Sequence, residues 1–355
     1  MSVLTNKPLL IAGPCSAENE AQLLETALTL KETGIELVRA GIWKPRTRPG
    51  TFEGIGDAGL TWIINVKEAT QLRFAIEVAN PHHVDKALKA GIDVLWIGAR
   101  STVNPFTVQA IADALRGVDI PVMVKNPVNP ELSLWMGALE RLDRAGLKQL
   151  AAIHRGFCTS QVSKFRNLPL WGIAIELKSK LPDVPIICDP SHMAGQRDLI
   201  LEIAQKALDL DYNGLMVEVH PDPASALSDS AQQLTPAAFT RMLQSLCFKK
   251  PKCSDAYYVH EMEDIREEID HLDREIVDLM ETRMRLVKKA GLKKIKHNVT
   301  ILQLQRWQNI LDSRSSWISN GHVRPEFIQD LFKIIHEESL RIQLDITENH
   351  LSDLT

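Results

Sequence analysis

The sequence predicts an α/β protein, a (β/α)8 TIM barrel followed by a small all-α, three-helix domain that pairs with a second copy. Eight short apolar runs alternate with amphipathic helical segments between residue 9 and about residue 245, and this number and length match a closed parallel barrel. After Leu246 the strand-like runs stop and a long helical periodicity begins. A doubly wound open sheet is the alternative for the first part, but it does not explain the polar residues that gather at the strand ends.

The expected strands share a high content of branched and aromatic side chains and short length. They are LLIAGP (9–14), ELVRAGI (36–42), RFAIEV (73–78), VLWIGA (94–99), PVMVKN (121–126), LAAIHRG (150–156), PIICDPS (185–191) and GLMVEVH (214–220). Segments between them, such as NEAQLLETALTLKETG and QRDLILEIAQKALDL, have the apolar spacing of helices that cover a sheet.

The bulk composition is that of an ordinary globular protein. The 355 residues are 45% hydrophobic and 24% charged, with a formal net charge of −4, so the composition points neither to nucleic acid nor to a membrane as a partner. No apolar stretch approaches the ~20 residues that cross a bilayer, and the first residues lack a secretory signal. Five cysteines without a compact spacing indicate reduced thiols and a cytoplasmic protein.

The change in residue pattern along the sequence divides the chain into a barrel domain (1–246), a linker (247–260) and a helical domain (261–355). The linker CFKKPKCSDAYY is basic and lacks periodicity. Residues 265 to 290 then place apolar side chains at alternating steps of four and three, which predicts one long helix. A second helix is expected over 300–318, and a third from Pro325 towards 349. Three helices of such unequal length favour a dimer.

Four metal-ligating side chains fall at the carboxyl ends of neighbouring strands, where barrel active sites lie. The first strand leads to Cys15, the seventh to His192 and the eighth to Glu218, and the following loop carries Asp229. One thiolate, one imidazole and two carboxylates suit a divalent transition metal, without distinguishing manganese, iron, cobalt or zinc. The alternative is a buried core thiol and an ordinary loop histidine.

Six cations follow the other strand ends, and we expect them in a sector away from the metal. They are Arg39, Lys44, Arg46, Arg100, Lys125 and Arg155. Like charges gathered in one cleft need anionic ligands, and arginine forks match phosphate and carboxylate oxygens. The predicted substrate therefore carries more than one such group. Surface ion pairs are the alternative, and they suit the loop cations better than those at strand ends.

At this point the motifs carry a resemblance. GPCS, RAGIWKPRT, IGAR, VKNP, HRGF, CDPSHMAG and VEVHPDPASALSD together resemble 3-deoxy-D-arabino-heptulosonate 7-phosphate synthase of the microbial type I branch, which is shared with the eight-carbon ulosonate synthases. The resemblance covers residues 9 to about 245 and implies condensation of phosphoenolpyruvate with erythrose 4-phosphate. KPRT favours the seven-carbon enzyme.

The resemblance also implies roles for single residues. Cys15, His192, Glu218 and Asp229 would hold one divalent metal ion; Arg39, Lys44, Arg100, Lys125 and Arg155 would clamp phosphoenolpyruvate; Arg46 and Thr47 would meet the aldose phosphate; and Glu77 would lie near the water that attacks C2. Lys44 is also expected to act in catalysis. Arg48 departs from the serine that many relatives carry after KPRT. Because the first strand begins at Leu9, we expect no regulatory domain before it.

The helical tail interrupts its apolar faces with polar side chains. Arg283 occupies an apolar position of the first helix, Lys294 projects from nearly the same face eleven residues later, and Ser339 and Gln343 interrupt the third helix. A buried guanidinium needs an anion, so these residues predict a pocket for a small dianion. The tail carries 14 basic and 18 acidic residues from 261 to 355, which disfavours nucleic acid despite its local basic run.

Residues 261 to about 350 resemble the all-helical chorismate mutase, whose intertwined dimer shares each site between two chains. On this resemblance Arg283, Lys294, Arg306, Ser339 and Gln343 would bind and rearrange chorismate, with Lys294 and Gln343 in catalysis and Arg266 supplied by the partner chain. Gln303 and Trp307 depart from the acidic residues that relatives usually have around the matching arginine.

Three interpretations of the whole chain remain open at this point. The first is a bifunctional enzyme that opens the shikimate pathway of aromatic amino acid biosynthesis and converts its end product chorismate to prephenate, which is also a possible inhibitor. The second is a synthase whose tail senses chorismate or prephenate with little turnover. The third is a synthase whose tail serves only to pair chains. The fused ligand site and the expected lack of another regulator motivate the idea of feedback.

Overall fold

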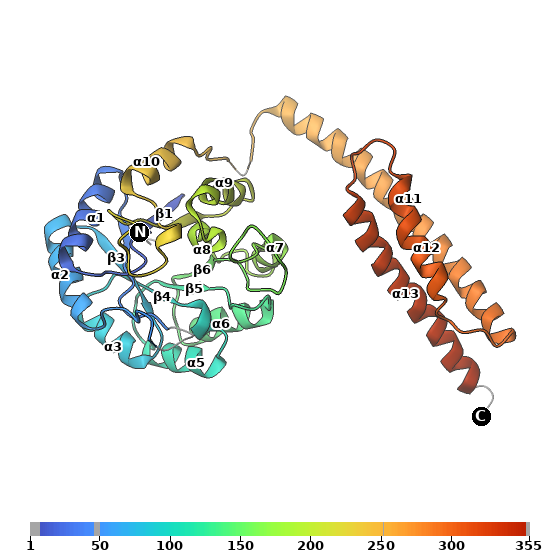
Figure 1. Ribbon diagram of the computed structural model, residues 1–355, viewed down its shortest axis with the longest axis horizontal. Coiled ribbons are helices and arrows are strands. Elements are labelled where there is room, and N and C mark those ends of the chain that lie inside the picture. Colours follow the sequence, from blue (N-terminus) through green and yellow to red (C-terminus); the bar gives the residue numbers. More distant parts are fainter. Residues whose placement is uncertain (1–7, 46–49, 251, 353–355) are drawn as a thin grey trace. The chain divides into compact units, whose positions relative to one another are not determined.

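Eight parallel strands close into a barrel in the computed structural model, which describes residues 8–45, 50–250 and 252–352 (Figure 1). The strands follow one another around the barrel in sequence order, and β8 pairs with β1 over Leu9–Gly13 and Gly214–Glu218. The barrel prediction is confirmed and the open sheet is excluded. The strands are β1 (Leu9–Gly13), β2 (Leu37–Arg39), β3 (Arg73–Val78), β4 (Val94–Ile97), β5 (Val122–Lys125), β6 (Leu150–His154), β7 (Ile186–Cys188) and β8 (Gly214–Glu218).

Most strands are shorter than the apolar runs that predict them, and their last residue comes before the last residue of the run. The run 36–42, for example, contains only the three-residue strand β2, and the residues after it belong to the loop at the active end of the barrel. The strands are mostly apolar because both of their faces are covered, and several of their polar residues, such as Arg39, Lys125 and Glu218, stand at the carboxyl ends. One set of side chains fills the barrel interior, namely Leu9, Ile11, Leu37, Ala75, Val94, Trp96, Met123, Ala151, Ile153, Ile187 and Met216.

Helices surround the strands, and side-chain caps fix the first turns of some of them. Asn80 and Asn104 each accept a backbone N–H from the first turn of a helix that begins with proline, a combination that favours helix initiation at that residue. The helices and 3-10 turns of this unit are α1 (Glu20–Glu32), α2 (Ala58–Thr70), α3 (Pro81–Lys89), α4 (Ala99–Thr102), α5 (Pro105–Ala114), α6 (Leu132–Arg144), α7 (Trp171–Lys180), α8 (Pro190–Ala194), η2 (Arg197–Leu199), α9 (Ile200–Asp209), η3 (Ser230–Gln232) and α10 (Pro236–Ser245).

Residues 252–355 form a second compact unit, separate from residues 1–251. It contains α11 (Ala256–Lys296), α12 (Leu304–Arg314), the 3-10 turn η4 (Ser315–Trp317) and α13 (Pro325–Ser352). Residues 256–260 were expected in the linker, but they form the first turn of α11 because the Asp255 side chain caps the N–H groups of Tyr257 and Tyr258. The second helix is shorter than the expected 300–318.

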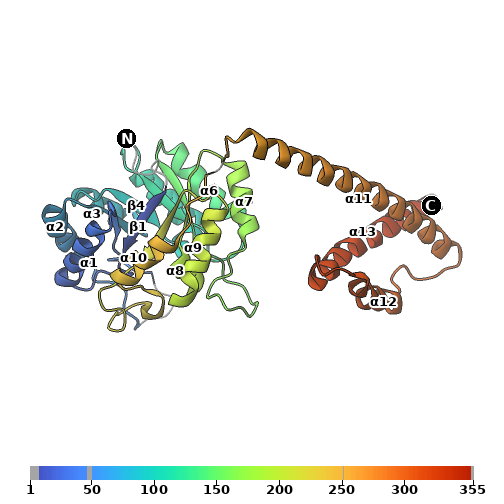
Figure 2. The same ribbon diagram turned by 90° about the horizontal axis from the view of Figure 1, so that it is seen from above.

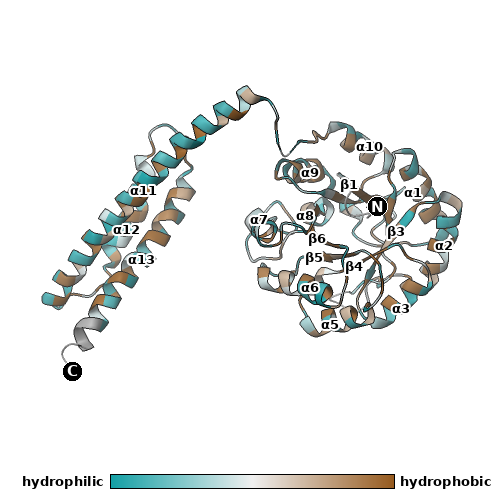
Figure 3. Ribbon diagram, turned by 180° about the vertical axis from the view of Figure 1, so that it is seen from behind, coloured by the Kyte–Doolittle hydropathy of each residue, from teal (hydrophilic) through white to brown (hydrophobic). Residues whose placement is uncertain are grey.

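The N-terminal half of α11 is uncovered in the single chain. Figure 2 shows α12 and α13 beside the C-terminal part of this long helix, and Gly291 is its only buried residue. The apolar side chains at alternating steps of four and three, which predicted this helix, are therefore exposed. They include Ile265, Ile269, Leu272, Ile276, Leu279 and Leu286, which are 47–69% exposed. Figure 3 shows that hydrophobic (brown) and hydrophilic (teal) segments alternate along α11.

None of the helices in the described part of the chain combines the length and the apolar composition that a bilayer crossing needs.

Candidate functional site

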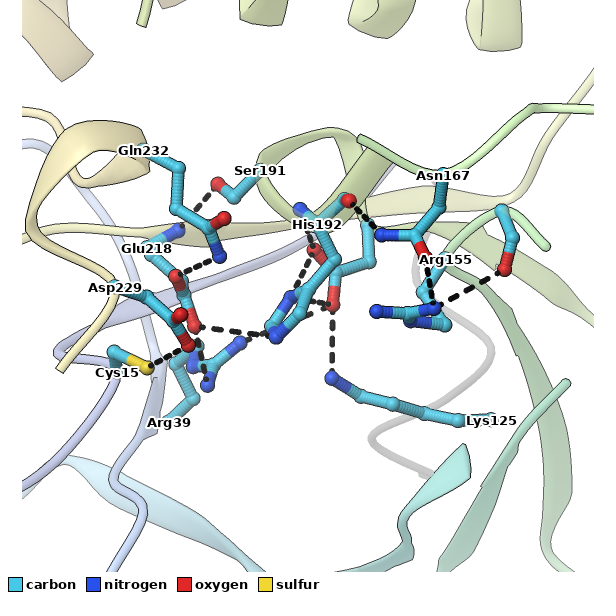
Figure 4. A network of polar contacts seen from close by, with 12 residues as sticks. Cys15, Arg39, Lys125, Arg155, Asn167, Ser191, His192, Glu218, Asp229 and Gln232 are labelled. Atoms are coloured by element: carbon cyan, nitrogen blue, oxygen red, sulfur yellow. Dashed lines mark hydrogen bonds and ion pairs between the residues drawn. The ribbon is translucent and has the colours of Figure 1, made fainter. Parts of the chain in front are cut away.

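Three of the four predicted metal ligands converge at the carboxyl end of the barrel. One ligand atom each from Cys15, Glu218 and Asp229 lies within 4.8 Å of the other two, and Cys15 Sγ is 3.3 Å from Asp229 Oδ2 (Figure 4). His192 borders this group, with its Nε2 3.7 Å from Glu218 Oε1. The closed barrel produces this convergence because β8 pairs with both β1 and β7.

Backbone contacts hold the first two of these residues in place. The N–H of Cys15, just beyond β1, donates to Gln233 Oε1 at 3.0 Å. The N–H of Glu218, at the end of β8, donates to Ser191 Oγ at 3.0 Å. One carboxylate oxygen of Glu218 accepts from Gln232 Nε2 at 2.7 Å, whereas the other, Oε1, is buried without a hydrogen bond in the described structure.

Asp189 orients His192. Its carboxylate lies 2.8–3.0 Å from His192 Nδ1 and caps the first turn of α8 through the His192 N–H. A carboxylate facing Nδ1 favours the proton on that nitrogen and leaves Nε2 as a lone-pair donor. Burial lowers the pKa of His192 despite the opposing charge of Asp189, so the imidazole is neutral and suited to bind a metal at neutral pH.

Asp229 completes the group from a left-handed backbone position with φ 49°. Its Oδ1 accepts from Arg166 Nη1 at 2.9 Å. Burial on its own would raise the pKa of Asp229, but His192, which is protonated in the acid range where Asp229 titrates, and the charges of Lys44 and Arg166 hold it below the usual range. The carboxylate therefore stays ionised.

The Cys15 thiol lies among anions. Burial raises the pKa of Cys15 to about 12, Glu218 adds to this increase, and Lys44 opposes it. Lys44 Nζ is 2.6 Å from Cys15 Sγ. Two carboxylates packed beside a buried sulfur fit a divalent cation, since Glu218 Oε1 makes an ion pair with Arg39 but no hydrogen bond within the described structure, and a bound metal would ionise the thiol.

Arg39 and Lys44 correct the expectation of two separate sectors. Both were expected away from the metal, yet Arg39 Nη2 is 3.0 Å from Glu218 Oε1 and Lys44 contacts Cys15. The reason is that β2 adjoins β1 and both side chains are long enough to reach the metal-ligand candidates. Nε and Nη1 of Arg39 are buried without hydrogen-bond partners in the described structure.

The remaining cations line a cavity of about 360 Å³. Lys125 donates to Asp189 at 2.8 Å, and Arg155 donates to Asn167 Oδ1 at 2.8 Å. Burial lowers the pKa of Arg155 to about 10, which keeps it charged at neutral pH. Arg100 lines the same cavity.

A smaller hollow of about 50 Å³ connects this cavity with the metal-ligand candidates. Its walls include Cys15, Lys44, His192 and Asp229, and it shares Glu77, Arg100, Lys125 and His192 with the larger cavity. An anion held by the cations would therefore lie beside the candidate metal. The predicted residues Arg46 and Thr47, and the departure Arg48, lie outside the described residues.

Glu77 is fixed by its neighbours on β4. Its Oε2 accepts from Trp96 Nε1 at 3.1 Å. Its carboxylate also packs on Gly98, since a Cβ at that glycine would stand 2.0 Å from Glu77 Oε1. The glycine of IGAR thus leaves the space that the carboxylate occupies.

Sequence reasoning missed several residues that hold the site together. Asp189 could have been predicted as a site residue, because it directly follows β7 and precedes a proline at the start of a helix. The loop residues Arg166, Asn167, Gln232 and Gln233 had none, since their partners are distant in the sequence.

In the helical unit, two predicted pairs meet between α11 and α13. Arg283 Nη1 donates to Ser339 Oγ at 2.7 Å, and Lys294 Nζ donates to Gln343 Oε1 at 3.0 Å. Gly291 permits the close approach, because a Cβ there would be 3.0 Å from Gln343 Cγ. Burial lowers the pKa of both cations.

The two other arginines predicted for the chorismate site, Arg266 and Arg306, are exposed, and no contact brings them to this group in the described single chain.

A closed barrel with an anion cavity beside a metal-ligand group defines an enzyme that acts on phosphorylated or carboxylated substrates. Comparisons identify its family. Residues 5–250 match the DAHP synthetase I family and residues 265–344 match chorismate mutase type II. The chain belongs to the DAHP synthetase I family and carries a chorismate mutase type II domain, which makes it a bifunctional enzyme of the shikimate pathway.

Several relatives and solved structures are similar to the barrel. Phospho-2-dehydro-3-deoxyheptonate aldolase of Thermotoga maritima is 31% identical over 237 residues, which is 67% of this chain and 68% of that protein. A 2-dehydro-3-deoxyphosphooctonate aldolase of Legionella pneumophila is 28% identical over 71% of this chain and 94% of its own length. A crystal structure of the Thermotoga enzyme aligns with TM-score 0.60 and 29% identity, covering 66% of each chain.

Gly98→Ala tests the placement of Glu77. The backbone at Gly98 has φ −73°, which alanine adopts without strain, but the new methyl group would displace the carboxylate. We expect kcat for condensation to fall about 10- to 100-fold with little change in Tm. Gly137→Ala is the matched control, because a Cβ there meets nothing within 4 Å. Equal kcat for both variants would contradict the placement.

Proposed function

We propose that the barrel condenses phosphoenolpyruvate with erythrose 4-phosphate in a metal-dependent reaction, and that the helical domain rearranges chorismate to prephenate within a dimer. The observation that carries the first part is the shared wall between the anion cavity and the group of Cys15, His192, Glu218 and Asp229. Membership of the family supplies the reaction, and the geometry supports these assignments.

Phosphoenolpyruvate is bound by the cations of the cavity in this proposal. Arg100 and Arg155 offer planar forks to its phosphate, and Lys125 adds a third charge deeper in the barrel. The unbonded Arg39 nitrogens suit the substrate carboxylate. Arg46 and Thr47 are assigned to the aldose phosphate by resemblance alone.

Cys15, His192, Glu218 and Asp229 would hold a divalent metal ion, which would supply Lewis-acid chemistry towards the aldehyde of erythrose 4-phosphate. C3 of phosphoenolpyruvate then attacks the aldehyde carbon, water adds at C2, and inorganic phosphate leaves. Lys44 lies between the metal-ligand candidates and the cavity, where its charge stabilises the oxygen that becomes negative. Glu77 lines both hollows and positions the water.

Removing divalent metal tests this assignment. Exhaustive chelation should abolish condensation, and adding back manganese, iron, cobalt or zinc should restore it and reveal the preferred ion. Chorismate turnover is the internal control and should not change, because no metal takes part in it. Full condensation activity in a metal-free preparation would exclude the metal role.

The rearrangement of chorismate needs no nucleophile, only a held conformation and donors for the ether oxygen as its bond to carbon breaks. Arg283, beside Ser339, binds a carboxylate. Lys294 and Gln343 lie 3.0 Å apart and together donate to the ether oxygen. In the substrate-free chain these groups bond to one another, and the substrate would replace those bonds.

Dimerisation is proposed through the uncovered face of α11. Its apolar side chains from Ile265 to Leu279 are about half exposed or more, and burying them against a second copy is favourable at roughly 25 cal/mol per Å². The same pairing would bring Arg266 of one chain to the site of the other. Erythrose 4-phosphate, phosphoenolpyruvate and chorismate are the proposed small-molecule partners, and the free cysteines support a cytoplasmic location.

Mixing two inactive variants tests the shared site. Arg283→Ala and Arg266→Ala should each reduce mutase kcat/KM by about 100-fold or more while condensation persists. Co-expressed in one cell, they should form mixed dimers in which one site has both arginines, and mutase activity should partly return. Arg285→Ala, on the exposed side of α11, is the control. Failure of the mixture to regain activity would exclude the shared site.

A regulatory tail is the second candidate, favoured by the fusion of a chorismate mutase type II domain to the synthase. Prephenate titrated into a condensation assay should inhibit the full chain and leave a chain ending at residue 250 unaffected. A flat response in both would exclude feedback through the tail.

A further inference from the structure

His336 and Trp307 form a stacked pair beside the residues assigned to chorismate. Their ring centroids are 4.0 Å apart and the rings are nearly parallel, at 10°. Trp307 belongs to α12 and His336 to α13. His336 lies three residues before Ser339 and seven before Gln343, so all three share one helix face. Ser339 and Gln343 are buried on this face.

The imidazole has a polar atom without a partner. His336 Nε2 is buried and makes no hydrogen bond in the described structure, whereas Arg283, Lys294, Ser339 and Gln343 bond among themselves. A buried polar atom without a partner destabilises the folded state. A hydrogen bond from a bound ligand would remove this cost.

The charge state of His336 suits a neutral ligand group. Burial lowers the pKa of His336, and the nearby charges of Arg283 and Lys294 lower it further, against a smaller opposing effect of Glu337. The ring is neutral at neutral pH, and its nitrogens can donate or accept. A hydroxyl, which also does both, is its natural complement.

Elimination identifies the hydroxyl. Chorismate offers two carboxylates, one ether oxygen and one ring hydroxyl. The proposed function gives one carboxylate to Arg283, brings Arg266 of the partner chain to the same site, and gives the ether oxygen to Lys294 and Gln343. It leaves the hydroxyl unassigned. We propose that His336, held in place by the Trp307 ring, contacts substrate and hydrogen-bonds the ring hydroxyl of chorismate through Nε2. This inference rests on the proposed mutase function.

If this contact exists, removing the imidazole should lower mutase kcat/KM only for a substrate that carries the ring hydroxyl. His336→Leu should lower mutase kcat/KM for chorismate about 10- to 100-fold. For the analogue with hydrogen in place of the ring hydroxyl, the same substitution should change kcat/KM less than about 3-fold, because the lost partner is already absent. His336→Gln retains an N–H near the Nε2 position and should recover part of the activity on chorismate.

Two controls separate this contact from a structural role. His322→Leu removes an exposed histidine of the same domain and should not change either rate. Condensation activity and helical circular dichroism should be unchanged in every variant. Equal losses on both substrates, or no loss on chorismate, would overturn the contact. If His336→Leu fails to fold, the same comparison with His336→Ala, which also removes the imidazole, decides the question.

The proposed function can fail independently. Lack of chorismate turnover by the unaltered full-length chain contradicts catalysis by the tail. In that case calorimetry measures the affinities of the unaltered protein and of His336→Leu, each for chorismate and for the analogue that lacks the ring hydroxyl. A loss of affinity in His336→Leu that needs the hydroxyl supports the contact, and an equal or absent loss overturns it.

Discussion

The buried carboxylate of Asp189 is the interaction on which the barrel site depends. It is fully inaccessible and contacts His192 on one side, Lys125 at 2.8 Å on the other, and Arg39 at 4.0 Å. Burial alone would raise the pKa of Asp189, but these three neighbours hold it well below the usual range. One ionised group thus sets the tautomer of a candidate metal ligand and fixes a cation of the substrate cavity. The metal-ligand group and the anion cavity are therefore parts of one network, and not two independent sites.

This network is incomplete without ligands. Arg39 has two buried nitrogens without hydrogen bonds in the described structure, and the buried Glu218 Oε1 has no hydrogen bond there but an ion pair with Arg39 Nη2 at 3.0 Å. Such groups are costly in a folded protein, and the proposed substrates and metal supply what they lack. The helical domain follows the same rule, since His336 Nε2 is unbonded beside a group whose other members bond to one another.

The sequence predicted the barrel and the strand-end residues because the period and the number of strands are encoded locally, and closure follows from the number of strands. Cys15, Glu218 and Asp229 meet because β8 adjoins β1, and the order of the runs is enough to infer that. The reach of Arg39 across to Glu218 was not predictable, since it depends on side-chain conformation in three dimensions. The start of α11 at Ala256 depended on a cap by Asp255, which the basic and irregular composition of the segment concealed. The roles of single residues follow from resemblance and geometry together, and they remain predictions.

The central claim is that Cys15 binds a divalent metal together with His192, Glu218 and Asp229. X-ray absorption at the edge of the metal that restores activity tests it directly. One sulfur at about 2.3 Å with nitrogen and oxygen ligands near 2.0–2.2 Å is expected for a zinc-like ion. The sulfur contribution should vanish in Cys15→Ser while the imidazole contribution persists. A bound, activating metal whose spectrum contains no sulfur in the unaltered protein would contradict the account.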